Sequence, residues 1–101
     1  MSDFEVEVLR DFTVIKNHVF KNKNLSRKAM GLLAQMLSLP PGWDYSERGL
    51  AAIGKDKLSS VKTAIKELED AGYIVRVQNR DEKGRMGKNK YRVFHEPKKN
   101  P

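Results

Sequence analysis

Hydrophobic positions along the chain recur first with a helical period and later with a period of two. Apolar side chains between residues 26 and 38 fall at i, i+3, i+4, i+7 and i+8, namely Ala29, Leu32, Leu33, Met36 and Leu37. This spacing puts them on one face of a helix. Ser26 stands where an N-terminal cap belongs, and Pro40 follows where the helix should end. The pattern predicts an amphipathic helix with one buried face.

The next two segments predict a pair of helices joined by a tight turn. Ser46 caps the first, which spans 47–53, and Gly54 stops it. The second begins near Ser59 and closes at Gly72. Its apolar face consists of Val61, Ala64, Ile65, Leu68 and Ala71. Two helices connected by a few residues that include a glycine indicate a helix-turn-helix.

Three segments predict β-strands. Residues 73–78 and 90–95 alternate with period two, and the polar stretch 79–89 between them contains two glycines, which predicts a hairpin with a long loop. Near the N-terminus, residues 11–15 are short and β-branched and predict a first strand that pairs beside the hairpin. A strand, three helices and a hairpin follow one another in a winged helix-turn-helix, an α+β fold with a three-helix core, a small antiparallel sheet and a β-hairpin wing.

Length and composition limit the possible functions. A chain of 101 residues has room for one domain, which we expect over residues 11–95, with an N-terminal tail at 1–10 and a C-terminal tail or linker start at 96–101. The absence of cysteine excludes disulfides and cysteine-ligated metals. Because no apolar run resembles a signal peptide or a membrane span, we expect a cytoplasmic, nucleoid-associated protein with no membrane partner.

The net charge favours a polyanionic partner. The chain carries 20 basic and 13 acidic side chains, giving a formal charge of +7. Residues 1–54 contribute +1 and residues 55–101 contribute +6. Such a balance is typical of nucleic-acid binding, and it locates the positive field in the third helix and the hairpin.

The third predicted helix has the polarity of a DNA-recognition helix. Basic and hydroxyl side chains occupy its first half, whereas Glu67, Glu69 and Asp70 lie in its last turns. This order opposes the helix dipole, which favours acids first by roughly 0.3 to 1 kcal/mol each. An approaching phosphate backbone explains it better. The predicted contacts with the major groove, or with phosphates at the turn before it, are Lys55, Lys57, Ser59, Ser60, Lys62, Thr63 and Lys66.

Two further basic clusters lie outside this helix. The hairpin segment 76–92 has a net charge of +5, and its loop predicts contacts with the DNA backbone or minor groove through Arg80, Lys83, Arg85 and Lys88. A third cluster flanks the start of the first long helix, where it could touch phosphates or remain solvated: Lys16, Lys21, Lys23, Arg27 and Lys28.

Signals for catalysis or cofactor binding are weak. Residues 49–55 match G-x-x-x-x-G-K, but Asp56 follows where serine or threonine should bind magnesium, and no predicted strand precedes the motif. His18 and His95 share no ligand spacing with a neighbouring acid. We therefore expect no enzymatic activity, no cofactor and no metal site.

Two stretches carry a resemblance to known families. Residues 25–40, with Trp43-Asp44-Tyr45 and Gly49-Leu50-Ala51, resemble the N-terminal winged-helix domain of replication initiator (replisome organiser) proteins of phages and mobile elements in Gram-positive bacteria. Residues 60–74 are similar to the recognition helix and first wing strand of many bacterial winged helices, transcription factors included. The resemblance implies sequence-specific binding of double-stranded DNA, at an origin or an operator, and replication-protein partners reached through a C-terminal region beyond this chain.

Two alternatives stay open at this level. A transcriptional regulator would bind DNA in the same way. A winged helix used as a protein-interaction module would instead pair an apolar patch, or the acidic strand-like segment 4–8, with a partner or a second copy in a homodimer.

Overall fold

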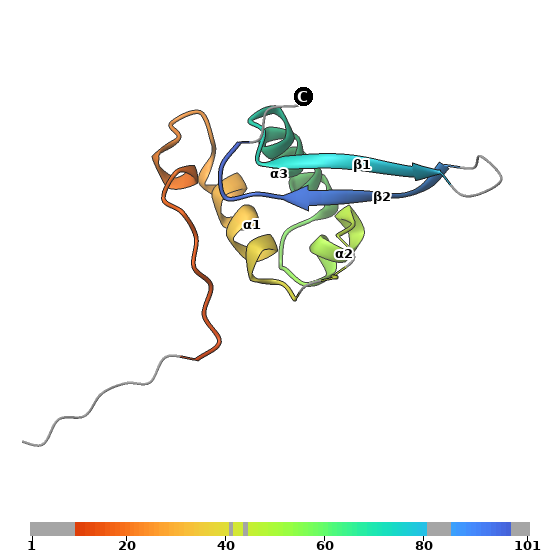
Figure 1. The fold of residues 1–101 in the computed structure, drawn as a ribbon, viewed down its shortest axis with the longest axis horizontal. Helices are drawn as coiled ribbons and strands as arrows, with labels where there is room; N and C mark the ends of the chain where they lie inside the picture. Colours follow the sequence, from red (N-terminus) through yellow and green to blue (C-terminus); the bar gives the residue numbers. More distant parts are fainter. Residues whose placement is uncertain (1–9, 41, 44, 81–85, 98–101) are drawn as a thin grey trace, which may run out of the picture.

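The computed structural model describes residues 10–97 except 41, 44 and 81–85, and for residues 78–80 and 86–90 it describes the backbone (Figure 1). Within this part, three α-helices precede a two-stranded antiparallel sheet, so the fold is α+β. The elements are η1 (Val19–Lys21, a 3-10 helix), α1 (Arg27–Ser38), α2 (Glu47–Ala52), α3 (Leu58–Asp70), β1 (Ile74–Arg80) and β2 (Met86–Val93).

The core lies between the helices and the base of the hairpin. Leu33 and Met36 of α1, Leu50 of α2 and Leu68 of α3 are at most 1% exposed. Tyr73, at the junction of α3 and β1, is fully buried. Burying these side chains is the main stabilising contribution to the fold.

The start of α1 confirms the predicted cap. The Ser26 hydroxyl accepts a hydrogen bond from the backbone N–H of Ala29 at 3.1 Å, which satisfies one of the free donors of the first turn. Of the predicted apolar face, Ala29, Leu33 and Met36 are buried, and Leu32 and Leu37 pack partly exposed against the same core. Period and cap together therefore located this helix correctly.

The end of α3 is a Schellman motif. Gly72 has a φ of +88°, and its N–H donates to the carbonyl of Glu69 at 3.1 Å. The N–H of Tyr73 donates to the carbonyl of Leu68 at 3.0 Å, so both last-turn carbonyls are satisfied. Glycine takes this left-handed conformation without steric cost. The motif reverses the chain and starts β1 beside α3.

The hairpin is longer, and its loop shorter, than the side-chain pattern predicted. The strands continue into the stretch 79–89, with Gln78 opposite Asn89 and Arg80 opposite Met86 after a register shift. The paired ends of β1 and β2 project beyond the helices (Figure 1). Backbone pairing in a projecting ribbon does not require a buried face, so polar residues continue the strands where apolar alternation stops.

The predicted first strand at residues 11–15 is wrong. This segment has no strand partner among the described residues, and Phe12 and Val14 are 67% and 75% exposed. The segment joins the domain at its end, where Ile15 packs partly buried against the core. The N–H of the next residue, Lys16, donates to His95 Nδ1 at 3.3 Å, and its ammonium lies 3.2 Å from Glu96. β-Branched composition measures fit to a pleated surface, and without a neighbouring strand it does not produce one.

Candidate nucleic-acid interface

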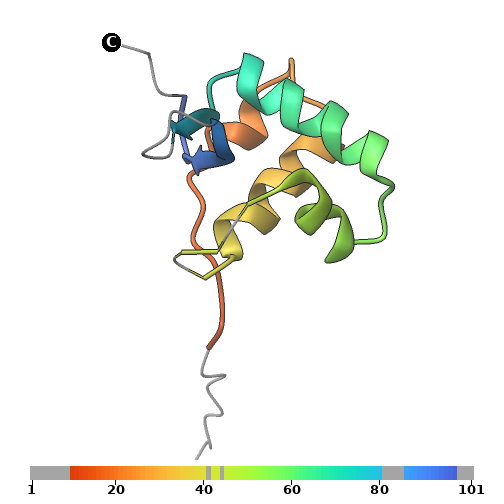
Figure 2. The same cartoon turned by 90° about the vertical axis from the view of Figure 1, so that its right-hand side faces the viewer.

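One side of α3 is open to solvent. Viewed down the hairpin, α3 lies at the edge of the helical bundle, and no other helix or strand covers its outer side (Figure 2). Ser59, Lys62, Thr63 and Lys66 are exposed there, one or two turns apart. Ser60 is half-buried. Four of the five predicted groove residues of α3 therefore share one accessible face.

The exposed side chains of this face differ in how they are held. Lys66 has no ion-pair partner within the described part of the chain, whereas the Lys62 ammonium lies 3.9 Å from the carboxylate of Glu47. The Thr63 hydroxyl donates to the carbonyl of Ser59 at 2.9 Å, within the helix. Lys66 is thus the cation available to an incoming phosphate or base, and Thr63 has already used its donor.

The turn before α3 supplies two more exposed cations. Lys57 occupies the N-cap position of α3 with backbone φ −72° and ψ 156°, and its side chain makes no capping hydrogen bond. Lys55 lies in the same connection. Both cations stand at the positive end of the α3 dipole, where an anion is the favoured neighbour. Their placement fits the phosphate contacts predicted for them.

The acids at the rear of α3 are engaged in tertiary contacts. Glu67 accepts hydrogen bonds from the backbone N–H of Ser26 at 3.0 Å and from its hydroxyl at 2.7 Å. These bonds to the ionised carboxylate hold the pKa of Glu67 below its ordinary value, the backbone bond most strongly. Glu67 therefore ties α3 to the start of α1.

Glu69 ties the same end of α3 to the hairpin. Its carboxylate accepts from the Arg76 guanidinium of β1 at 2.8 Å, and the Arg76 guanidinium also lies 3.8 Å from Glu47 of α2. The guanidinium stands 5.2 Å from the ring centre of Tyr91 in β2, within cation–π range. One arginine thus links α2, α3 and both strands at the base of the wing.

A shallow hollow runs between α3 and the base of the hairpin. Its charged lining consists of Lys62 and Lys66 on the α3 side, Arg76 on the β1 side, and the acids Glu47, Glu69 and Asp70. Glu47 pairs with Lys62 and Arg76, and Glu69 pairs with Arg76. The hollow therefore joins α3, from Lys62 to Asp70, to the base of β1, and it holds as many acids as cations.

The predicted wing residues fall largely outside the described part of the molecule. Lys83 and Arg85 lie outside the described residues, and for Arg80 and Lys88 only the backbone, in β1 and β2, is described. The third basic cluster lies apart from the front of α3, because Ser26 and the segment 22–25 that precedes it border the rear end of α3. Positive charge therefore occurs at both ends of α3.

Sequence reasoning missed the linking function of Glu47 and the surface position of Phe20. The Glu47 carboxylate lies near the cations of Lys62 and Arg76, and it accepts a hydrogen bond from the Tyr91 hydroxyl at 3.4 Å. Such convergence of distant residues leaves no periodic signal. Phe20 did carry a signal, an aromatic among lysines at positions 21 and 23.

Comparison of the chain with protein-family models, with curated proteins and with solved structures found no match. Within the described residues, no cluster of three or more His, Asp or Glu side chains is arranged to hold a metal ion. No helix in that part of the chain has the length and apolar content needed to cross a bilayer. Functional inference therefore rests on the fold and on the exposed side chains.

Proposed function

We propose that the domain is a winged helix-turn-helix that binds double-stranded DNA sequence-specifically, with α3 in the major groove and the hairpin as a wing. The B-DNA major groove, about 12 Å wide, accepts an α-helix side-on. The helix pair α2 and α3, followed directly by a projecting hairpin, supports this fold assignment. The net charge of +7 supports a polyanionic ligand.

The observation that carries the proposal is the difference in charge and contacts between the two ends of α3. Its front end holds exposed cations and hydroxyls, while Glu67 and Glu69 at its rear accept hydrogen bonds from Ser26 and from Arg76 of β1. A helix that displays positive charge at its front against its own dipole, and holds Glu67 and Glu69 in internal contacts, is suited to phosphate contact. Lys66 is the strongest candidate for reading a base or clamping a phosphate.

Replication initiation of a phage or mobile element is the biological setting we favour. Its support is the resemblance of residues 25–40 and of the Trp43–Tyr45 turn to initiator domains. A transcriptional regulator remains the competing role, since both use the same contacts with DNA. Selection of binding sites from random duplexes, mapped onto the source genome, separates them: an origin-like repeat array favours initiation and a promoter-overlapping operator favours regulation.

The test of DNA binding is charge reversal on the front of α3. Lys66→Glu should weaken binding to a selected duplex roughly tenfold or more, because a cation at the groove becomes a repelled anion. Lys62→Glu should have a smaller effect, since Glu47 already shares this cation. With about five phosphates neutralised, log K for the wild type should fall against log salt with a slope of roughly −4 to −5.

Lys16→Glu is the matched control for charge. It changes the net charge by the same amount at an exposed position beside His95 and Glu96, away from α3. Duplex affinity and salt slope should stay close to those of the wild type. If Lys16→Glu and Lys66→Glu lost the same amount of duplex affinity, binding would depend on net charge alone. If Lys66→Glu kept the affinity of the wild type, α3 would not be part of the interface.

A further inference from the structure

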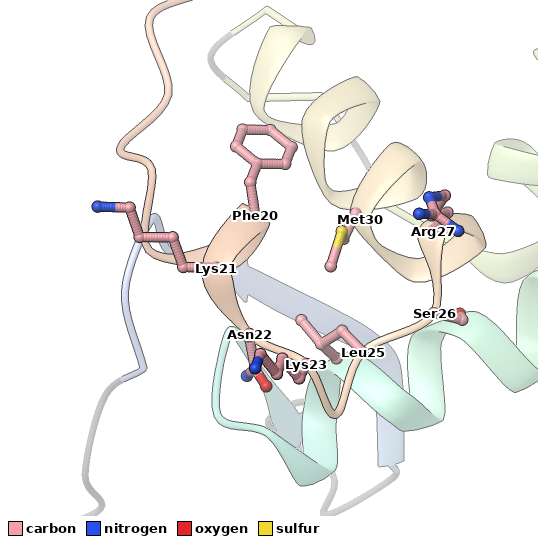
Figure 3. Close-up of a pocket in the computed structure, with 8 residues that line it drawn as sticks. All are labelled: Phe20, Lys21, Asn22, Lys23, Leu25, Ser26, Arg27 and Met30. Atoms are coloured by element: carbon pink, nitrogen blue, oxygen red, sulfur yellow. The ribbon is translucent and has the colours of Figure 1, made fainter.

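A second basic surface lies at η1 and the start of α1, away from the front of α3. A hollow of about 400 Å³ opens there between the two elements. Figure 3 shows Phe20 of η1 and Met30 of α1 on either side of it, with Leu25 below. The rim carries Lys21, Lys23 and Arg27, and no acid lines the hollow within the described chain.

Phe20 is an exposed aromatic ring on a fixed support. It is 47% exposed, although the neighbouring Val19 is 1% exposed and anchors η1 in the core. The N–H of Phe20 donates to the carbonyl of Asn17 at 3.0 Å. Two residues before Phe20 in the sequence, His18 Nδ1 lies 2.7 Å from the Tyr73 hydroxyl, and two residues after it, Asn22 Nδ2 lies 3.4 Å from the same hydroxyl. The turn that presents Phe20 is therefore held at both ends.

Phe12 is also an exposed aromatic residue, but its surroundings differ from those of Phe20. It is 67% exposed on the extended segment before Lys16, which has no strand partner among the described residues. Phe20 instead faces a hollow with a defined wall and floor (Figure 3). Presenting an aromatic face on a rigid turn lowers the entropic cost of stacking a ligand against it.

We propose that this hollow binds single-stranded nucleic acid, with one unpaired base stacked on Phe20 and the adjoining phosphates held by Lys21, Lys23 and Arg27. An aromatic face within a cationic rim is the combination that single-strand sites use, because every base has a flat apolar face and every linkage a charge. In a duplex those faces are covered by neighbouring base pairs. An acidic peptide would match the charge but would not require a planar ring.

The positions of the cations suit a strand that crosses the hollow. Lys21 and Arg27 stand at opposite ends of it (Figure 3). Glu67 is the acid bound to the rim residue Ser26, and its carboxylate is already engaged by two hydrogen bonds. The volume is sufficient for one nucleoside, and it lies in the size range of ligand sites. This site is separate from the duplex face, because none of its lining residues belongs to α3.

The test measures the affinity of a labelled oligothymidylate of about ten nucleotides by fluorescence anisotropy. Phe20→Leu keeps an apolar side chain but removes the planar face, and it should weaken binding about tenfold. Phe20→Trp should bind at least as tightly as the wild type, with quenching of its indole fluorescence on stacking. Phe12→Leu, the matched aromatic control, should leave affinity unchanged.

An abasic oligonucleotide of the same length supplies the phosphates without the bases. The proposal expects the wild type to bind it more weakly than oligothymidylate, and the deficit should disappear in Phe20→Leu. Equal affinity of the wild type for both oligonucleotides would overturn base stacking. Lys21→Gln should lower the affinity for both oligonucleotides, whereas Lys16→Gln should leave both affinities unchanged.

Two further results would overturn the proposal. If oligothymidylate did not bind at low salt, the hollow would not be a single-strand site, and an acidic amphipathic peptide would be the next ligand to test. Identical affinities of Phe20→Leu and wild type would make the cations a non-specific phosphate surface. The duplex variants at Lys62 and Lys66 should leave oligothymidylate affinity unchanged, so failure here and failure of duplex recognition are separately visible.

Discussion

The two ends of α3 differ in their surroundings, because the front is exposed on its outer face and the rear is held by tertiary contacts. The front, from Ser59 to Lys66, packs Val61, Ala64 and Ile65 in the core and exposes Ser59, Lys62, Thr63 and Lys66 on its outer face. Of these exposed cations, only Lys62 has an ion-pair partner within the described residues. The rear, from Glu67 to Gly72, is joined to α1, to β1 and to the core through paired acids, buried Leu68 and a Schellman turn. The contacts at the rear therefore fix the orientation in which the outer face of the front is presented to solvent.

The largest expected effect on stability follows from truncating a buried side chain in the rear of α3. Leu68 is fully buried, and Leu68→Ala should lower the free energy of unfolding by about 3 kcal/mol, because lost transfer energy adds to the cost of a cavity. Urea unfolding followed by circular dichroism measures this loss. At temperatures where the variant remains folded, its duplex affinity should match the wild type. A large affinity loss in the folded variant would mean that front and rear are not separable.

A smaller effect is expected from the turn that closes the helix. Gly72→Ala places a Cβ on a residue with a φ of +88°, which should cost about 1 kcal/mol. Gly31→Ala is the matched control, since a Cβ at Gly31 meets nothing within 4 Å and the site is helical. It should leave stability unchanged or raise it slightly. Equal midpoints of thermal unfolding for Gly72→Ala and wild type would show that a Cβ at this positive φ does not destabilise the fold.

The smallest effect concerns the link between Glu67 and Ser26. Glu67→Ala should lower the free energy of unfolding by less than about 1 kcal/mol, because the pair is solvent-exposed. The folded protein lowers the pKa of Glu67 from an ordinary 4.5, so its contribution is complete above that pH and is lost as the pH falls through the folded pKa.

Unfolding of wild type and Glu67→Ala at pH 7 and at successively lower pH tests this sign. The difference in stability should be greatest at pH 7 and should shrink below about pH 4.5. A difference that grows on acidification would contradict the pairing of the ionised carboxylate with Ser26. Duplex affinity at pH 7 should change little, since Glu67 lies on the rear of α3.

Prediction from the sequence succeeded where a pattern reports burial or a cap. The apolar faces of α1 and α3, the Ser26 and Ser46 caps and the turn at Gly72 are all present. It failed where backbone pairing decided the outcome: residues 11–15 are not a strand, and β1 and β2 extend into the expected loop. Pairing depends on a neighbour in space, which side-chain periodicity does not encode.

The candidate interface divides in the same way. Sequence alone identified the cations and hydroxyls of 55–66, because their types and helical spacing are visible without coordinates. It could not show that Glu47 shares Lys62, or that Arg76 joins α2, α3 and the hairpin. Those distances are set by how the elements pack.

By itself, the sequence determined the helices, their capped ends, the basic character of the second half and the polarity of α3, since each follows from local residue types and their period. Only the tertiary structure decided which charges remain available. Folding brought Glu67 to Ser26 and Glu69 to Arg76, left Lys66 open, and set Phe20 on the wall of a basic hollow. The physical reason is that pairing and exposure depend on distances between residues far apart in the chain, and packing alone fixes those distances.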